Sequence, residues 1–178
     1  LLELVNDIIK LSRLDEGGDK LERQRVELHA LAENVLANLE SVAEKCHVTL
    51  SLTGGAAYVT GVPALLSEML YNLCDNAVKY NVDGGSVRVD IAQSTAETVL
   101  TVSDTGIGIP YAHQSRVFER FYRVDKSHSK AVGGTGLGLS IVKHAAQYHN
   151  ARLELQSDVG KGTEIRIFFP AVRPASPS

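Results

Sequence analysis

Two asparagines and a lysine recur at helical spacing in the stretch LSEMLYNLCDNAVKYN, which spans residues 66–81. Asn72, Asn76 and Lys79 stand at positions i, i+4 and i+7, so they share one face of the helix that the stretch predicts, with Tyr80 beside them. Asparagine costs a helix interior roughly 0.6 kcal/mol relative to alanine, so two on one face need an explanation. They can form an ordinary solvated surface, or they can offer amide oxygens to Mg²⁺ while the lysine contacts phosphate groups.

A glycine-rich segment, GGTGLGLS at residues 133–140, runs directly into another predicted helix. Glycines allow backbone N–H groups to approach an anion closely, and the start of a helix adds a positive partial charge. The polar residues 127–132 before it do not form the buried strand that a Rossmann dinucleotide site requires. No lysine followed by serine or threonine ends the run, so it is not a Walker-type loop. A phosphate-binding loop and a plain structural turn both remain open.

The segment DTGIGIP, residues 104–110, follows a strand predicted at residues 97–102. Such a segment is commonly only a turn. The alternative is that Asp104 accepts a hydrogen bond from the exocyclic amino group of a base, with Gly106 and Gly108 leaving room for a flat ring. A carboxylate committed to such a donor at a water-poor site rejects a base that lacks it.

Aromatic residues and arginines cluster in RVFERFYRVD, residues 116–125, within an otherwise polar segment. Phe118 and Phe121 are expected to anchor the segment in the core rather than to contact a ligand. Either Arg120 or Arg123 can reach a phosphoryl group during its transfer, as arginines do in other phosphoryl-transfer sites.

The composition is that of an ordinary globular protein. The chain has 178 residues, 44% of them hydrophobic and 22% charged, with a net charge of −3. This balance gives no sign of nucleic-acid binding, and no basic run suggests contact with a membrane surface. Cys46 and Cys74 lie far apart, so we expect reduced thiols rather than a disulfide. No apolar run reaches the ~18 residues of a membrane span, and the start at LLELV suggests a fragment of a longer protein.

Periodicity and turn residues predict a mixed order of helices and strands. Helices are expected at about 1–14, 29–45, 63–80, 113–118 and 136–149, and strands at 25–28, 48–52, 58–60, 86–91, 97–102, 152–156 and 163–169. Short turns between neighbouring strands indicate antiparallel pairing, so the predicted fold is a two-layer α/β (α+β) sandwich. The first helix has no evident partner in its own segment, so we expect it to pack on a helix outside the chain or on a second copy.

Taken in order, these stretches resemble the catalytic ATP-binding domain of sensor histidine kinases, in the Bergerat (GHKL) ATPase superfamily. NLCDNAVKY resembles the asparagine box, and DTGIGIP resembles the first glycine box. FERF resembles the phenylalanine box, GTGLGL the second glycine box and GKGT the last one. The resemblance covers about residues 25–170, with order and spacing kept, and it implies the Bergerat fold with ATP and Mg²⁺ as cofactors.

The resemblance also implies roles for individual residues. Asn76 matches the magnesium ligand, Asp104 matches the residue that reads adenine, and Asn72, Lys79 and Tyr80 match positions near the phosphates and the ribose. The residues expected to be catalytic are Asn72, Lys79 and Arg123. Residues 111–133 match the ATP lid. The full set that the resemblance places around the nucleotide comprises Asn72, Asn76, Lys79, Tyr80, Asp104, Gly106, Gly108, Ile109, Phe118, Arg120, Phe121, Gly134, Thr135, Gly136, Leu137, Gly138, Leu139 and Thr163.

The residue at position 72 bears on the reaction. ATP-hydrolysing relatives such as gyrase carry a glutamate there that activates water, whereas the neutral amide of Asn72 cannot take a proton. This favours a kinase over a hydrolase. The other possibilities are a GHKL ATPase that drives a conformational cycle, a serine kinase acting as an anti-sigma switch, and a nucleotide-binding module without catalysis.

One departure from the family concerns the phosphate-accepting histidine, whose H-E-L-R-T-P-L pattern does not occur in this sequence. His29, in VELHALAEN, lacks the residues that follow the acceptor. The resemblance implies that residues 1–18 end a dimerisation hairpin, that 19–172 form the ATP-binding domain, and that 173–178 form a disordered tail. It also implies a cytoplasmic domain of a membrane-anchored, homodimeric bacterial parent, which would work with its own phosphoacceptor domain and a response-regulator receiver domain.

Overall fold

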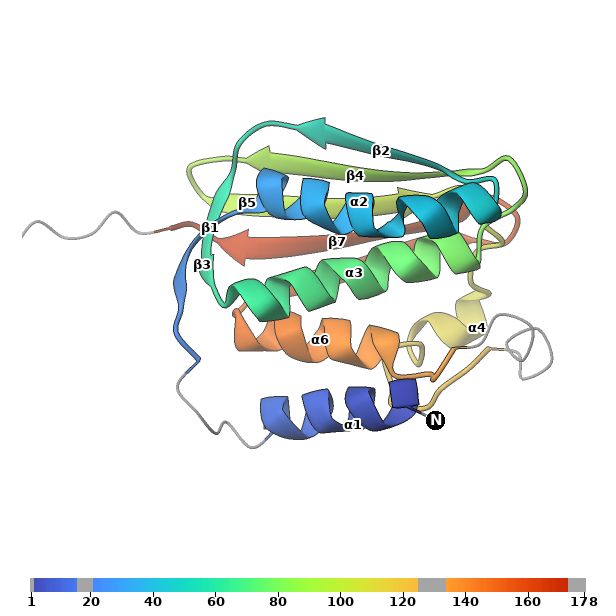
Figure 1. Cartoon of the computed structure of the whole chain (residues 1–178), viewed down its shortest axis with the longest axis horizontal. Helices are drawn as coiled ribbons and strands as arrows, with labels where there is room; N and C mark the ends of the chain where they lie inside the picture. The colour runs from blue at the N-terminus through green and yellow to red at the C-terminus, as the bar shows by residue number, and fades with distance from the viewer. Residues whose placement is uncertain (1, 16–20, 125–133, 173–178) are drawn as a thin grey trace, which may run out of the picture.

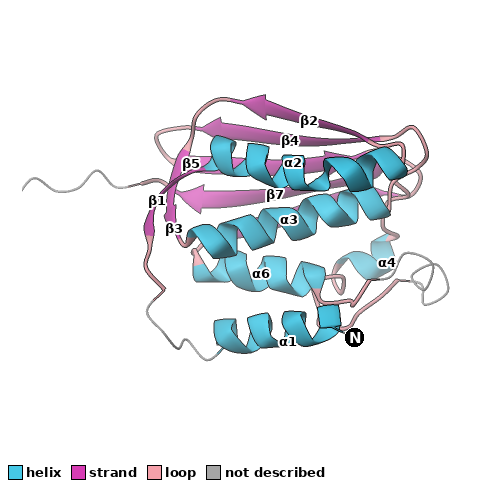
Figure 2. Cartoon of the chain, viewed as in Figure 1, coloured by secondary structure: helices cyan, strands magenta, loops and turns pink. Residues whose placement is uncertain are grey.

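One sheet of five strands carries a layer of helices on one of its faces (Figures 1 and 2). The computed structural model describes residues 2–15, 21–124 and 134–172. The helices are α1 Leu2–Asp15, α2 Leu28–Lys45, α3 Pro63–Lys79, α4 Tyr111–Gln114 and α6 Gly138–Tyr148. The strands are β1 Gln24–Glu27, β2 Thr49–Gly54, β3 Tyr58–Gly61, β4 Ser86–Gln93, β5 Glu97–Asp104, β6 Arg152–Asp158 and β7 Gly162–Pro170. The predicted two-layer α/β fold is confirmed, while the predicted tail at 173–178 lies outside the described residues.

The order of the strands corrects one prediction. The sheet runs β2-β4-β5-β7-β6, and β2 pairs with β4 in parallel, whereas the other pairs are antiparallel. The expected pairing of β2 with β3 is wrong, because β3 pairs with β1 in a separate two-stranded ladder. The physical reason is the position of α3, which lies between β3 and β4 in the chain. Together β3 and α3 form the connection between β2 and β4, and a crossover of this kind, which passes through a helix on the sheet face, joins parallel strands.

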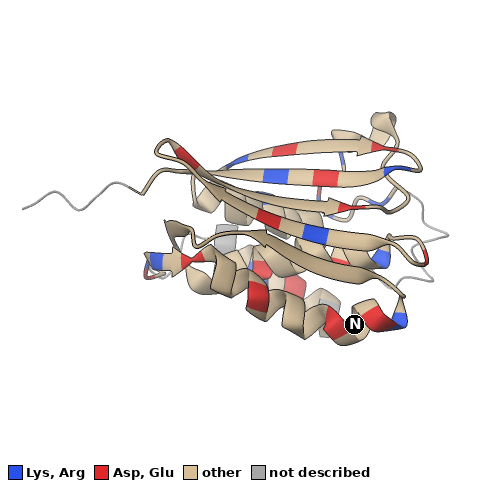
Figure 3. Ribbon diagram, turned by 90° about the horizontal axis from the view of Figure 1, so that it is seen from above, with Lys and Arg blue, Asp and Glu red and all other residues tan. Residues whose placement is uncertain are grey.

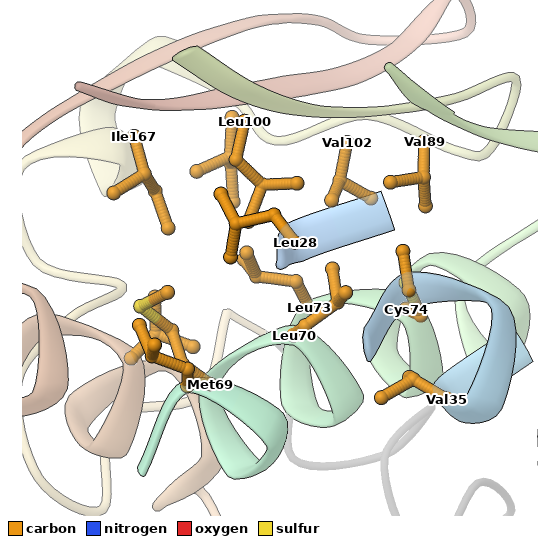
Figure 4. Close-up of a cluster of buried hydrophobic side chains, with 14 of the residues drawn as sticks. Leu28, Val35, Met69, Leu70, Leu73, Cys74, Val89, Leu100, Val102 and Ile167 are labelled. Atoms are coloured by element: carbon orange, nitrogen blue, oxygen red, sulfur yellow. The ribbon is translucent and has the colours of Figure 1, made fainter. Parts of the chain in front are cut away.

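The core lies between the sheet and the helices, and α3 contributes most directly to it (Figure 4). One side of α3 forms a buried apolar stripe: Leu66, Met69, Leu70 and Leu73 are at most 2% exposed. Figure 4 shows Leu70 and Leu73 turned toward side chains of the sheet such as Leu100 and Val102. Burial of this stripe fixes the rotation of α3, so Asn72 and Asn76 are only partly buried on another face.

The other face of the sheet is not covered by any helix of the described residues and bears charges of both signs (Figure 3). Arg166 pairs with Glu164 at 2.5 Å, for example, and Arg152 lies over the ring of Phe168 at 3.8 Å. Mixed charges of this kind are typical of a solvated surface. None of the helices in the described part of the chain combines the length and hydrophobicity that a membrane crossing requires.

Helix α1 packs against α6 at the edge of the helical layer (Figure 1). Leu11 is 3% exposed and forms a small cluster with Leu137 and Ile141. The expectation that α1 would find no partner in the chain is therefore wrong for this side of the helix. Leu4 is partly buried against the same cluster, whereas Leu2, Val5, Ile8 and Ile9 are exposed.

The ends of two further elements differ from the prediction. Helix α6 begins at Gly138 rather than at residue 136, because Gly136 has a φ of +76°, which is incompatible with a right-handed helix. The short helix α4 spans Tyr111–Gln114 rather than 113–118. Both cysteines are free thiols, as expected, and burial raises the pKa of Cys74 to about 12.

Candidate functional site

The start of α6 faces the two asparagines of α3. A Cβ atom at Gly138 would lie 3.0 Å from Asn72 Oδ1 and 3.8 Å from Asn76 Nδ2, so a side chain at this position would press on the Asn72 amide. Asn72 Nδ2 donates to the backbone oxygen of Glu68 at 2.9 Å and to its Oε1 at 3.2 Å, which directs Asn72 Oδ1 toward α6. No side chain caps the start of α6, so its positive partial charge is directed at this space.

Tyr80, which follows α3, connects three parts of the site. Its carbonyl accepts a hydrogen bond from Ile107 N at 3.0 Å, and a Cβ at Gly106 would lie 2.4 Å from that same oxygen. Its hydroxyl lies 3.6 Å from the position of a Cβ at Gly134. The segment 104–110 and the described part of the glycine-rich segment, residues 134–140, are therefore both in contact with the end of α3. Lys79 Nζ, at the same end, pairs with Asp75 at 2.7 Å.

Asp104 stands at the end of β5 with its carboxylate fixed by the backbone. Oδ1 accepts hydrogen bonds from Gly106 N at 2.8 Å and Thr163 N at 3.2 Å. Burial raises the pKa of Asp104, and these two N–H groups offset part of that effect. Since both bonds end on Oδ1, the second oxygen, Oδ2, is available to accept from a ligand.

A cavity of about 560 Å³ opens beside this carboxylate. Its lining includes Asp104 and Thr163 from the sheet, Gln114 from α4, and Lys161 from the turn between β6 and β7. Among the described residues, Asn72 and Asn76 lie outside this lining, so the two halves of the predicted site do not form one continuous cavity.

The segment after Asp104 is attached to the turn between β6 and β7. Gly108 has a φ of +72°, and a Cβ there would lie 2.1 Å from the carbonyl oxygen of Asp158. Ile109 N donates to Ser157 Oγ at 2.8 Å, and Gly160 N donates to Ile107 O at 2.9 Å. These contacts explain why the segment needs glycine at 108, and they hold it against the strand ends.

The two phenylalanines of FERF behave differently. Phe118 packs against the main core, as predicted. Phe121 is 58% exposed, so its predicted role as a core anchor is wrong. The reason is its backbone: Phe121 has a φ of +62°, and its N–H donates to Gly136 O at 2.9 Å, which places this residue against the glycine-rich segment.

The two candidate arginines also separate. Arg123 lies beside the glycine-rich segment, with Nη2 at 3.6 Å from the position of a Cβ at Gly134. Arg120 is exposed, and its Nη2 lies 3.2 Å from His144 Nε2 on α6. Residues 125–133 of the predicted lid lie outside the described residues.

The glycine-rich segment itself contacts both the core and α1. Thr135 Oγ1 donates to Asp7 Oδ2 at 2.8 Å, and Leu137 is fully buried beside Leu11. Leu139 packs against the main core. In this structure the side chains of Thr135 and Leu137 are thus directed at α1.

Sequence reasoning missed several residues that organise the site. Ser157 and Gln114 bind the segment 104–110, since Gln114 Nε2 donates to Ile109 O at 2.9 Å and to Ser157 O at 2.8 Å. Glu68 contacts Asn72 and also pairs with Lys10 at 2.8 Å. A serine in a strand or a glutamate on a helix has no distinctive spacing, so the sequence carried no signal for them.

A mixed sheet whose strand end carries a fixed carboxylate, next to an asparagine-bearing helix and a glycine-rich helix start, defines an α/β nucleotide-binding domain. The family model of histidine kinase-, DNA gyrase B- and HSP90-like ATPases matches residues 61–173. The chain belongs to this family of ATPases, which confirms the relationship that the motifs predicted.

The relatives include named sensor kinases. The sensor-like histidine kinase SenX3 of Mycolicibacterium smegmatis is 35% identical over 172 residues, which cover 96% of this chain and 44% of that protein. The mycobacterial sensor histidine kinase MprB superposes with a TM-score of 0.74 at 28% identity, covering 84% of this chain and 97% of that one. Full-length ShkA in complex with AMPPNP gives a TM-score of 0.84 at 25% identity, covering 99% of this chain and 37% of that one. The chain thus spans less than half the length of SenX3.

Proposed function

We propose that this chain is the ATP-binding catalytic part of a two-component sensor histidine kinase. Its parent would transfer the γ-phosphoryl group of ATP to a histidine, for relay to an aspartate of a response-regulator receiver domain. The observation that carries the proposal is the Asp104 carboxylate, held through Oδ1 by two backbone N–H groups at 2.8 and 3.2 Å. A preorganised acceptor beside a cavity suits the exocyclic amino group of adenine.

The asparagines of α3 and the start of α6 support the phosphate end of the proposal. Asn76 would offer its amide oxygen to Mg²⁺, which shields the phosphate charge when bound. The first N–H groups of α6, with Lys79 and Arg123, would bind phosphate oxygens and keep the chain of phosphates aligned. The close approach of Gly138 to both asparagines brings the start of α6 and this face of α3 together, so that both can contact the same phosphate chain.

The chemistry at position 72 supports transfer to histidine rather than to water. Asn72 is a neutral amide whose Nδ2 donates to Glu68, so it cannot remove a proton from an attacking water. The nearby carboxylate of Glu68 pairs with Lys10. Bound ATP would therefore persist until an imidazole nucleophile reaches it. A GHKL ATPase cycle and an anti-sigma serine kinase are the alternatives that the assays below would reveal.

The division of the chain and its partners belong to the same proposal. Residues 1–18 would end the dimerisation hairpin that carries the acceptor histidine, and residues 19–172 would form the ATP-binding domain. The exposed side chains of Leu2, Val5 and Ile8 on α1 support packing on such a hairpin in a homodimeric parent. The ATP-binding domain would lie in the cytoplasm, and the parent would be anchored in the bacterial cell membrane.

Calorimetric titration of the purified chain with ATP tests the proposal, with and without Mg²⁺. We expect Asp104→Asn to weaken binding at least tenfold, because an amide presents an N–H group where adenine also presents one. Asn76→Ala should reduce the gain in affinity that Mg²⁺ provides. Asp90→Asn, on the open face of β4, and Asn34→Ala, exposed on α2, are the matched controls and should bind as the unchanged chain does.

A test of the phosphoryl-transfer step requires a longer chain, extended by ~60 residues before residue 1. This number of residues is enough for a helix hairpin, because a helix rises ~1.5 Å per residue. Acid-labile phosphate on this chain after incubation with ATP is the expected product. If the unchanged chain and Asp104→Asn bind ATP equally tightly, Asp104 is not the residue that recognises adenine. Rapid steady-state release of phosphate without protein phosphorylation would favour the ATPase alternative.

A further inference from the structure

The hydroxyl of Ser157 occupies the centre of a hydrogen-bond network beside Asp104. Ser157 Oγ lies 2.8 Å from Ile109 N, 2.9 Å from the carbonyl oxygen of Gly162 and 2.8 Å from Thr163 Oγ1. Thr163, in turn, donates its backbone N–H to Asp104 Oδ1 at 3.2 Å. Ser157 thus touches three of the segments that surround the carboxylate, although it stands on the edge strand β6.

Counting protons fixes the direction of each bond. Ile109 N–H can only donate and the Gly162 carbonyl can only accept, so Ser157 accepts from the first and gives its single proton to the second. The remaining lone pair of Ser157 then accepts from the Thr163 hydroxyl. The opposite arrangement, with Ser157 donating to Thr163, would leave the Gly162 carbonyl without this donor. The proton of Thr163 is therefore directed at Ser157.

This arrangement has a consequence for the cavity. Thr163 and Asp104 both line it, and with its proton committed to Ser157 the Thr163 hydroxyl presents only lone pairs there. Asp104 Oδ2 is also an acceptor. Two acceptors that face the 6-position of a purine can each accept one of the two N–H donors of a 6-amino group, whereas a 6-oxo group presents only an acceptor there.

We infer that Ser157 is a positioning residue that sets base selectivity: by holding the Thr163 hydroxyl as an acceptor, it favours a 6-amino purine over a 6-oxo purine. The inference rests on the proposed ATP-binding function. Without Ser157, the Thr163 hydroxyl is free to rotate and to donate to a 6-oxo group. Selectivity then depends on Asp104 alone.

The test compares the affinities of ATP and inosine triphosphate, which carries a carbonyl oxygen in place of the 6-amino group. We expect Ser157→Ala to lower the ratio of the two affinities about five- to tenfold, the effect of one hydrogen bond of ordinary strength. Ser157→Thr keeps the hydroxyl and should restore the ratio. Ser51→Ala is the matched control, since Ser51 on β2 bonds the carbonyl oxygen of Val87 at 3.5 Å and, among the described residues, lies outside the lining of the cavity.

The outcomes separate this inference from the proposed function. If the unchanged chain binds neither nucleotide, the proposed function fails. Suppose that the unchanged chain prefers ATP. The selectivity role of Ser157 is then overturned if Ser157→Ala has the same ratio of ATP to inosine triphosphate affinity, including the case in which both affinities fall equally. Thermal unfolding of each variant checks that it is folded. If the alanine variant does not fold, Ser157→Cys takes its place with the same expectation, because a thiol is a weak acceptor.

Discussion

Replacing Gly138 with alanine should separate the stability of the chain from its affinity for nucleotide. Alanine is favoured over glycine by about 1 kcal/mol within a helix, although Gly138 is the first residue of α6 and gains only part of this. Against it, the new Cβ would lie 3.0 Å from Asn72 Oδ1, so the amide must shift by a few tenths of an ångström. Such crowding costs about 1 kcal/mol. The free energy of unfolding should therefore change by less than about 1 kcal/mol.

Binding should change much more. The added methyl group would press on the Asn72 amide where the start of α6 meets α3, next to the place where we propose that phosphate oxygens bind. Loss of one hydrogen bond to a charged group costs about 1.5–3 kcal/mol, which corresponds to a ten- to hundredfold weaker affinity. The shift of the Asn72 amide is limited, because Nδ2 is held by Glu68 at 2.9 and 3.2 Å.

Urea unfolding and calorimetric titration with ATP and Mg²⁺ measure the two effects on the same sample. Gly55→Ala is the matched control, because a Cβ there meets no atom within 4 Å and the position lies in the connection between β2 and β3. A folded Gly138→Ala variant that binds ATP as tightly as the unchanged chain would refute the placement of the phosphates between α3 and α6.

Two further predictions concern stability. Burial lowers the pKa of His149, so near neutral pH the folded state binds fewer protons than the unfolded state. The free energy of unfolding should therefore be greatest at pH values above 6.5, the ordinary pKa of histidine, and should fall as the pH drops below that value. Urea denaturation between about pH 5 and pH 7.5 should show this dependence of the free energy of unfolding on pH for the unchanged chain and for a variant of the exposed His47. An equal dependence in His149→Gln would show that His149 is not its source. Leu11→Ala should free α1 from α6 at a local cost of about 2–3 kcal/mol, with faster hydrogen exchange of the α1 amides and little change in the sheet. The exposed Ile8→Ala is its control, and unchanged exchange in α1 would show that the Leu11 contact contributes nothing.

The parts of the fold that the sequence predicted depend on local periodicity. The stripe through Leu66, Met69 and Leu70 identifies both the helix and its buried face, since side chains three and four residues apart meet the same surface. The same rotation places Asn72 and Asn76 on another face. The predicted contact of Thr163 and Asp104 with one site is consistent with the register of β5 and β7, where these two residues are paired.

The parts that could not be predicted depend on contacts between distant segments. Parallel pairing of β2 with β4 follows from where α3 packs, and no pattern within residues 49–61 records it. The outward position of Phe121 follows from a backbone bond to Gly136, fifteen residues later. Ser157 joins Ile109 and Thr163 only because β6 lies at the sheet edge beside the segment 104–110.

The contacts of α1 have a geometric consequence. Asp7, Lys10 and Leu11 are spaced by three and four residues, so they lie along a single side of the helix. They meet Thr135, Glu68 and Leu137 respectively, by two polar bonds of 2.8 Å and one buried apolar contact. Advancing the helix by one residue, a translation of about 1.5 Å with a turn of roughly 100°, would break all three together. These three contacts therefore support one axial register of α1 on the domain, and intermediate positions would form none of them.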